Sequence, residues 1–217
     1  MERLAVFDLD GTLVDSAPDI HAALDRLMAS RGLVPFTRAE VKAMIGDGVT
    51  VLVQRACAAR GIPADEATIA AFSADYTARA AERTALFAGI PQALATLNEA
   101  GWRLAVCTNK PQAATEALLG ALGIGPLFAA IGAGDSFPVR KPDPRHLLAT
   151  LRQAGGEPSR AVMVGDHRND VLAASGAGLP CVFALWGYGP PEMAEGCAAL
   201  ARVPAELPGL FDQLVPQ

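Results

Sequence analysis

Two carboxylates with a single residue between them follow an apolar run near the start of the chain. The run is LAVF, residues 4–7, and Asp8 and Asp10 follow it, with Gly11 and Thr12 next. Like charges this close repel each other, and a desolvated carboxylate is costly without a partner. In water, an Asp-Gly dipeptide is an ordinary turn. At the end of a buried strand, the same pair indicates that a positive group binds there.

Other residues of kinds that bind phosphate or metal lie far along the chain, most of them close behind other short apolar runs. Hydroxyl and amide groups donate hydrogen bonds to anions, an ammonium group neutralises charge, and carboxylates bind cations. In open α/β sheets, ligands bind beyond the carboxyl ends of the strands, so we expect these residues to gather there. They are Thr108, Asn109, Lys141, Gly165, Asp166 and Asp170.

Short apolar runs predict the strands that would position these residues. The runs are residues 4–7, 103–107, 128–131, 161–164 and 181–185. Continuous apolar runs of this length fit strands covered on both faces, as in a parallel sheet. Helical spacing of apolar residues separates them, in segments 91–101, 111–123, 145–155 and 169–178. The alternation predicts a doubly wound α/β fold.

Residues 15–85 break this rhythm, because they contain no comparable strand run and read as several helices. Thr37 and Glu40 have the T-x-x-E spacing of a capping box, which marks one helix start. We therefore expect an all-helical module inserted after the first strand. The α/β core would consist of residues 1–14 and 86–217, with its polar strand ends facing the module.

Composition limits the other possibilities. The chain has 217 residues, 51% of them apolar, and a net charge of -5. That is enough for one core or a core with a small second domain, and the lack of a basic stripe disfavours nucleic acid as a partner. No signal peptide and no membrane span are expected. The cysteines form no CxxC pair and are expected to be free thiols in a reducing cytoplasm; they are Cys57, Cys107, Cys181 and Cys197.

Four segments, taken in order, resemble the four motifs of the haloacid dehalogenase superfamily. They read DLDGTLVDS, CTNKP, RKPDP and GDHRND. The resemblance covers essentially the whole chain, including a helical cap inserted just after the first motif. It implies a Rossmann-like α/β core, an all-helical cap and Mg²⁺-dependent chemistry on phosphate esters.

The resemblance implies distinct roles for three carboxylates. Asp8 would be the nucleophile that forms an aspartyl-phosphate, which splits one difficult step into two. Asp8 and Asp166 would bind Mg²⁺ through their side chains, and Asp10 through its backbone carbonyl. The Asp10 side chain would then protonate the leaving alcohol and activate water.

The other motif residues would bind or support the phosphate. By the same resemblance, Thr108 would hydrogen-bond the phosphoryl oxygens, Lys141 would neutralise the phosphate and Asp8, and backbone N–H groups near Asn109 would cradle the phosphate oxygens. Asp170 would orient Lys141 or a metal-bound water, next to the strand-end Gly165.

The inserted module offers its own candidates. Gly46, Asp47 and Gly48 resemble the cap loop that reaches the substrate in this superfamily, and Arg55 could bind a substrate carboxylate. An ordinary turn at Asp47 and a solvated Arg55 are the open alternatives.

Two residues help to distinguish the reactions that members of this superfamily catalyse. Dehalogenases of this superfamily lack the second aspartate, so Asp10 favours phosphoryl transfer over carbon–halogen hydrolysis. Phosphonatases use a cap lysine, but nothing around Lys42, the lysine of residues 15–85, marks such a role. The segments GDGVTVLVQRA, GAGDSFPVRKPDP and GYG look most like those of bacterial phosphoglycolate phosphatases, which act on 2-phosphoglycolate with Mg²⁺.

Several alternatives stay open. Phosphatases of sugar or amino-sugar phosphates and pyrophosphatase-like members share these motifs, as do β-phosphoglucomutases. A catalytically silent phosphoester-binding module is the alternative outside enzymes. We expect a small-molecule phosphate ester as the partner, whereas the sequence leaves monomer and homodimer undecided because no helix shows a sustained heptad seam.

Overall fold

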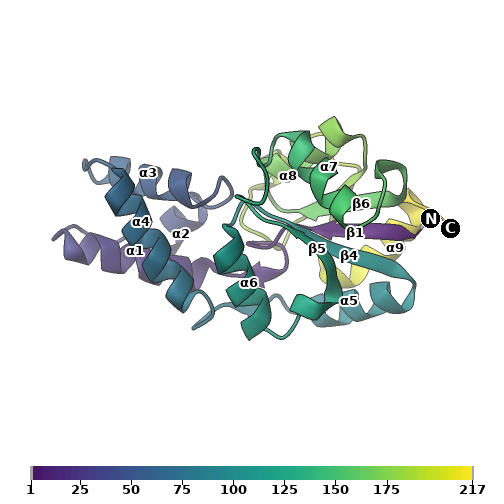
Figure 1. The fold of residues 1–217 in the computed structure, drawn as a ribbon, viewed down its shortest axis with the longest axis horizontal. Coiled ribbons are helices and arrows are strands. Elements are labelled where there is room, and N and C mark those ends of the chain that lie inside the picture. Colours follow the sequence, from purple (N-terminus) through teal and green to yellow (C-terminus); the bar gives the residue numbers. More distant parts are fainter. Residues whose placement is uncertain (1, 217) are drawn as a thin grey trace.

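A parallel sheet of six strands forms the centre of the larger part of the molecule (Figure 1). The computed structural model describes residues 2–216. The strand order is β5-β4-β1-β6-β7-β8, and each neighbouring pair is parallel. The strands are β1 (Arg3–Phe7), β4 (Trp102–Cys107), β5 (Phe128–Gly132), β6 (Ala161–Gly165), β7 (Cys181–Ala184) and β8 (Ala199–Ala201).

Helices cover both faces of this sheet. Successive side chains of a strand point to opposite faces. Ala5 and Phe7 therefore join one apolar cluster, while Leu4 and Val6 join the other. The first cluster includes α5 (Ile90–Glu99), α6 (Gln112–Ala121) and α9 (Leu207–Leu214), and the second includes α7 (Pro144–Gln153) and α8 (Arg168–Ala177). Double coverage explains the continuous apolar runs and confirms the doubly wound α/β class.

Four helices make up a separate apolar cluster at one end of the molecule, which we call the cap (Figure 1). They are α1 (Ala17–Ser30), α2 (Arg38–Lys42), α3 (Val49–Ala59) and α4 (Glu66–Arg79). The predicted capping box at α2 is confirmed: Glu40 N donates to Thr37 Oγ1 over 3.3 Å and Thr37 N to Glu40 Oε2 over 2.7 Å.

Two short antiparallel strands join the cap to the core. They are β2 (Val14–Asp15) and β3 (Ala85–Leu86), with Val14 opposite Leu86. The chain therefore leaves the core and returns to it at one place, with both chain ends at the far end of the core (Figure 1).

The sequence did not predict every element. The strands β2, β3 and β8 have only two or three residues, too few to show a hydrophobic period. Leu200 of β8 is 52% exposed, so this edge strand also lacks a continuous buried run. Helix α2 ends at Lys42, earlier than its apolar pattern indicates, because the chain turns toward Gly46, whose φ of 125° no helix accommodates.

Two sequence expectations concern the rest of the chain. All four cysteines are free thiols, three of them buried. Within residues 2–216, no helix combines the length and the apolar character that a membrane span requires.

His146 lies on the buried side of α7. Its Nε2 donates to the Ala133 carbonyl over 2.9 Å, and its Nδ1 lies 3.6 Å from Cys107 Sγ. Burial, together with the positive charge of Lys141, lowers the pKa of His146 to about 4. The folded protein therefore holds this imidazole neutral at pH values where an unfolded histidine takes up a proton.

We predict that His146→Gln reduces the sensitivity of the fold to acid. The unfolded state binds a proton near pH 6.5 and the folded state only near pH 4, so the wild type loses stability as the pH falls through this window. Between pH 6.5 and 5 the wild type should lose about 1.5 kcal/mol more than the variant. Urea unfolding followed by circular dichroism measures this difference. The remaining histidines are common to both proteins, so parallel stability curves would contradict the prediction.

Candidate active site

The carboxyl ends of three adjacent strands bring distant parts of the sequence together. Asp8 follows β1, Thr108 follows β4 and Asp166 follows β6, and β1 lies between the other two. Backbone bonds extend the sheet to these residues: Asp8 N donates to Val164 O and Thr108 N to Gly132 O, each over 2.8 Å. The sheet therefore fixes where each of these side chains begins.

A buried lysine lies between two buried aspartates. Lys141 Nζ is 2.9 Å from Asp8 Oδ1 and 2.6 Å from Asp170 Oδ1. The second oxygen of Asp170 accepts from His167 N over 3.0 Å, which caps α8 and fixes the carboxylate. Burial alone would lower the pKa of Lys141, but Asp170 and Asp8 raise it. Lys141 is therefore a fixed positive charge beside Asp8.

The same carboxylates fit a divalent cation. Asp8, Asp166 and Asp170 each place a carboxylate oxygen within 4.8 Å of the others. Asp8 Oδ1, although it touches Lys141, is a buried oxygen with no hydrogen-bond partner. Burial, with the negative charges of Asp8 and Asp170, raises the pKa of Asp166 to about 7. Concentrated buried carboxylates, one of them with an oxygen that accepts no hydrogen bond, are the environment that an oxygen-binding divalent cation stabilises.

Asp8 and Asp166 are better placed than Asp170 to bind this cation through their side chains. Both oxygens of Asp170 have partners, Lys141 Nζ at 2.6 Å and His167 N at 3.0 Å, whereas Lys141 contacts one oxygen of Asp8, at 2.9 Å. The partners of Asp166 are neutral donors, as is usual around a metal-binding carboxylate. Thr12 Oγ1 donates to one of its oxygens over 3.0 Å, and Tyr188 N to the other over 2.7 Å.

Glycines allow the backbone to approach these carboxylates closely. A Cβ at Gly11, whose φ is 87°, or at Gly187 would overlap Asp166, and one at Gly165 would overlap Asp170. The backbone N–H groups of Tyr188 and Gly189 donate to Asp166, and a Cβ at Gly187 or Gly189 would overlap this aspartate.

Asp10 has a partner that the sequence reasoning missed. Lys110 Nζ lies 3.0 and 3.2 Å from the two oxygens of Asp10 and donates to the hydroxyl of Tyr76 on α4. Burial alone would lower the pKa of Lys110, but Asp10 and Tyr76 raise it, so it carries a charge. The sequence feature that could have identified Lys110 is its position in CTNKP, immediately after Asn109. A lysine beside a proline reads as an ordinary loop residue, and nothing in the sequence places Tyr76 near it.

Asparagine side chains dock the cap loop on the core. Asn109 Nδ2 donates to Gly46 O over 3.0 Å and to Lys141 O over 2.9 Å. Asn169 Nδ2 donates to Asp47 Oδ1 over 2.7 Å. The Asn109 side chain thus links the cap loop to the segment that carries Lys141, a role different from the backbone contact to phosphate that the sequence predicted.

Asp47 and Arg55 bind each other rather than facing the site. Arg55 Nη2 lies 2.6 Å from Asp47 Oδ2, and Arg55 Nη1 donates to Met44 O. The structure does not place either residue on the wall of the central cavity, so their contact with a substrate stays a prediction. Gly46, from the same loop, does line the cavity.

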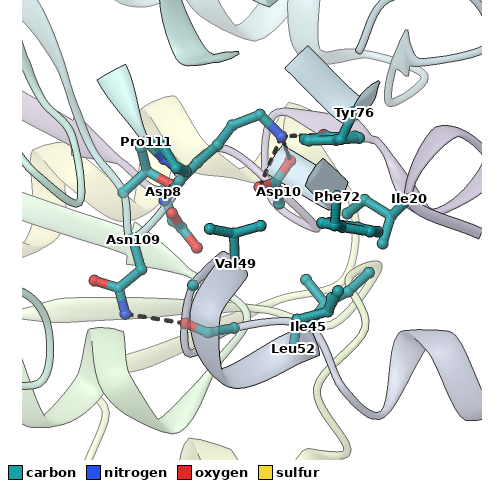
Figure 2. A pocket seen from close by; sticks show the side chains of 14 residues that line it. Asp8, Asp10, Ile20, Ile45, Val49, Leu52, Phe72, Tyr76, Asn109 and Pro111 are labelled. Carbon is teal, nitrogen blue, oxygen red and sulfur yellow. Dashed lines mark hydrogen bonds and ion pairs between the residues drawn. The ribbon is translucent and has the colours of Figure 1, made fainter. Parts of the chain in front are cut away.

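A cavity of about 50 Å³ lies between the strand ends and the cap. Figure 2 shows Asp8 and Asn109 on one side, with Ile20, Ile45 and Phe72 grouped away from them. The described residues that line it are Asp8, Asp10, Ile20, Ile45, Gly46, Gly48, Val49, Leu52, Phe72, Tyr76, Thr108, Asn109, Lys110 and Pro111.

Comparison with known proteins gives consistent matches. The family model of haloacid dehalogenase-like hydrolases matches residues 2–178. A phosphoglycolate phosphatase of Agrobacterium fabrum is 41% identical over 99% of this chain and 95% of its own. The crystal structure of a predicted phosphoglycolate phosphatase from Haemophilus somnus is 30% identical, with a TM-score of 0.87 over 96% of this chain and 97% of its own. CbbY from Rhodobacter sphaeroides, solved with phosphate, is 30% identical, with a TM-score of 0.82 over 95% and 96%.

We predict that the packing of Gly165 against Asp170 makes any side chain there costly. Gly165→Ala would force Asp170 from its place, and overpacking of this kind lowers the free energy of unfolding by about 1–3 kcal/mol. Gly120 is the matched control, because it lies inside α6 with open space around a Cβ, where alanine should add about 0.5–1 kcal/mol. Denaturant unfolding of both variants measures the difference. Equal effects at the two glycines would refute this account of the site.

Proposed function

Because the chain belongs to the haloacid dehalogenase-like hydrolases, we propose that it hydrolyses a small phosphate monoester through a phosphorylated Asp8. One observation carries the proposal. Asp8 and Asp10, two residues apart, line the same cavity, each with its own buried lysine. A nucleophile and a proton donor are thus available to one bound ester. The cap, residues 15–85, would choose the ester, and the core, residues 1–14 and 86–217, would perform the reaction.

The first step transfers the phosphoryl group to the enzyme. A carboxylate oxygen of Asp8 forms a bond to phosphorus as the bond from phosphorus to the leaving oxygen breaks. The Asp10 carboxyl gives its proton to that oxygen, which leaves as an alcohol. Lys141 neutralises the negative charge shared by Asp8 and the phosphate, and Thr108 at the end of β4 donates a hydrogen bond to a phosphoryl oxygen.

The second step restores Asp8. The Asp10 carboxylate now takes a proton from a water molecule, whose oxygen forms a bond to phosphorus. The bond from phosphorus to Asp8 breaks, so the products are inorganic phosphate and a free carboxylate. Asp10 thus acts first as an acid and then as a base, and it is protonated again at the end of the reaction.

We propose Mg²⁺ as the cation of this site. The side chains of Asp8 and Asp166 would hold it, together with the backbone carbonyl of Asp10. Bound there, it would neutralise charge between the nucleophile and the incoming phosphate. Support comes from the oxygen-only donor set and from the Asp8 oxygen that accepts no hydrogen bond.

The proposed substrate is 2-phosphoglycolate, which yields glycolate and phosphate. Relatives that carry the name phosphoglycolate phosphatase match at 41–46% identity over most of the chain. The cavity supports a small leaving group, since about 50 Å³ is the space of roughly three to five water molecules on the measure where one needs roughly 10–15 Å³. A sugar or amino-sugar phosphate, pyrophosphate and phosphomutase chemistry are the alternatives.

We predict that Asp8→Asn and Asp10→Asn fail in different ways. Asp8→Asn should lower kcat by about 10³-fold or more, because no acyl phosphate can form. Asp10→Asn should lower kcat by about 10²–10⁴-fold with 2-phosphoglycolate but leave Mg²⁺ affinity nearly unchanged, since its proposed metal contact is backbone. Phosphate release and calorimetric Mg²⁺ titration of both folded variants provide the readouts. Near-normal turnover in Asp8→Asn, or lost Mg²⁺ binding in Asp10→Asn, would contradict these roles.

We also predict a strong preference among esters. With glucose 6-phosphate and glucosamine 6-phosphate as competitors, kcat/KM should be at least about tenfold higher for 2-phosphoglycolate, because larger leaving groups do not fit the cavity without moving the cap. Faster release of phosphate from an amino-sugar phosphate would show that 2-phosphoglycolate is not the preferred substrate, but it would not contradict the proposed mechanism. Conversion of β-glucose 1-phosphate into glucose 6-phosphate without release of phosphate would indicate a mutase.

A further inference from the structure

Lys110 is a buried cation on the cavity wall that the proposed mechanism leaves without a task. It is 4% exposed and lines the cavity, whereas Lys141 does not. Of the residues described around this cavity, Lys110 is the basic one. A charge buried this deeply is costly unless it is paired, so its position calls for an explanation.

Its contact with Asp10 places Lys110 on the leaving-group side of the site. Asp10, as proton donor, must lie against the oxygen that leaves. A cation 3.0 Å from the Asp10 carboxylate therefore lies close to the atoms attached to that oxygen. Lys141, by contrast, contacts Asp8 and so lies on the phosphate side.

The rest of the leaving-group side is apolar. Its wall carries Ile20, Ile45, Leu52 and Phe72 of the cap, which Figure 2 shows on the side away from Asp8. Sugar hydroxyls would lose their hydrogen bonds to water against these side chains. A carboxylate would lose still more, unless a cation bound it. The wall thus suits a small group with one anionic end.

We propose that Lys110 binds the carboxylate of the leaving group and so selects acidic phosphate esters over neutral ones. The inference rests on the proposed function, since it assigns one end of 2-phosphoglycolate to a residue. The Lys110 ammonium has three N–H donors, and its acceptors are the two oxygens of Asp10 and the Tyr76 hydroxyl. Since two oxygens of one carboxylate can share a single N–H, a substrate carboxylate can bind the remaining one.

The role of Tyr76 follows from the same contacts. Its hydroxyl accepts a hydrogen bond from Lys110, and it stacks on Phe72 with ring centroids 6.1 Å apart. Because α4 carries both rings, the cap fixes the direction in which the ammonium group points. Lys110 is thereby a core residue whose position depends on the cap.

The test compares two esters that differ only in charge. One is 2-phosphoglycolate, and the other is its amide, in which a neutral carboxamide of nearly the same shape replaces the carboxylate. Lys110→Met should lower kcat/KM for the acid by about 10²–10³-fold and for the amide by no more than about fivefold. Lys110→Gln, which keeps hydrogen-bonding capacity beside Asp10, should show the same selective loss, and it carries the test where the methionine variant does not fold.

Each result has a distinct meaning. Arg26→Met is the control: it removes a cap cation that pairs with Asp75 outside the cavity, and it should leave the ratio of the two esters unchanged. Equal losses on both esters would show that Lys110 only positions Asp10, and no loss on either would remove it from the site; both overturn the inference. A wild type that hydrolyses p-nitrophenyl phosphate but neither ester would instead overturn the proposed substrate, whatever the variants do.

Discussion

The ion pairs of Lys141 with Asp8 and Asp170 are the interaction on which the rest of the site depends. Three aspartates from β1, β6 and α8 are brought within 4.8 Å, where their mutual repulsion and their loss of water would oppose folding. Lys141 offsets part of that charge from inside the protein, at 2.9 and 2.6 Å from two of them. Asp166 is left with a raised pKa and neutral partners, which is the situation that a cation relieves. The folded core thus holds more negative than positive charge at this site, and the proposed Mg²⁺ would offset the excess.

The two buried lysines contact different aspartates of the site. Lys141 lies against Asp8, the proposed nucleophile, and Lys110 lies against Asp10, the proposed proton donor. Asp8 and Asp10 are separated by one residue and line the same cavity, while each has a different buried lysine as its partner. In the proposed mechanism, these different surroundings suit one to be the nucleophile and the other the proton carrier.

Sequence alone predicted those parts of the molecule that depend on short-range pattern. The apolar runs before Asp8, Thr108 and Asp166 identified their strands, because strands covered on both faces have no polar positions to obscure them. The contact of Lys110 with Tyr76 and the contact of Asp47 with Asn169 were not predictable in this way. Lys110 meets Tyr76, 34 residues away, only because α4 packs over the strand ends, and Asp47 reaches Asn169 across 122 residues. Contacts between cap and core leave no periodic signal in either segment.

Selectivity and chemistry therefore occupy different parts of the sequence but share one cavity. The ion pairs of Lys141 with Asp8 and Asp170 lie within the core. The apolar wall and Tyr76 come from the cap, and a change there alters which leaving group fits. Lys110 couples the two, since it binds the Asp10 carboxylate of the core and is directed by a tyrosine of the cap. A cap that departs from the strand ends would leave the phosphate site intact but Lys110 undirected, so recognition of the leaving group requires the cap and core to be in contact.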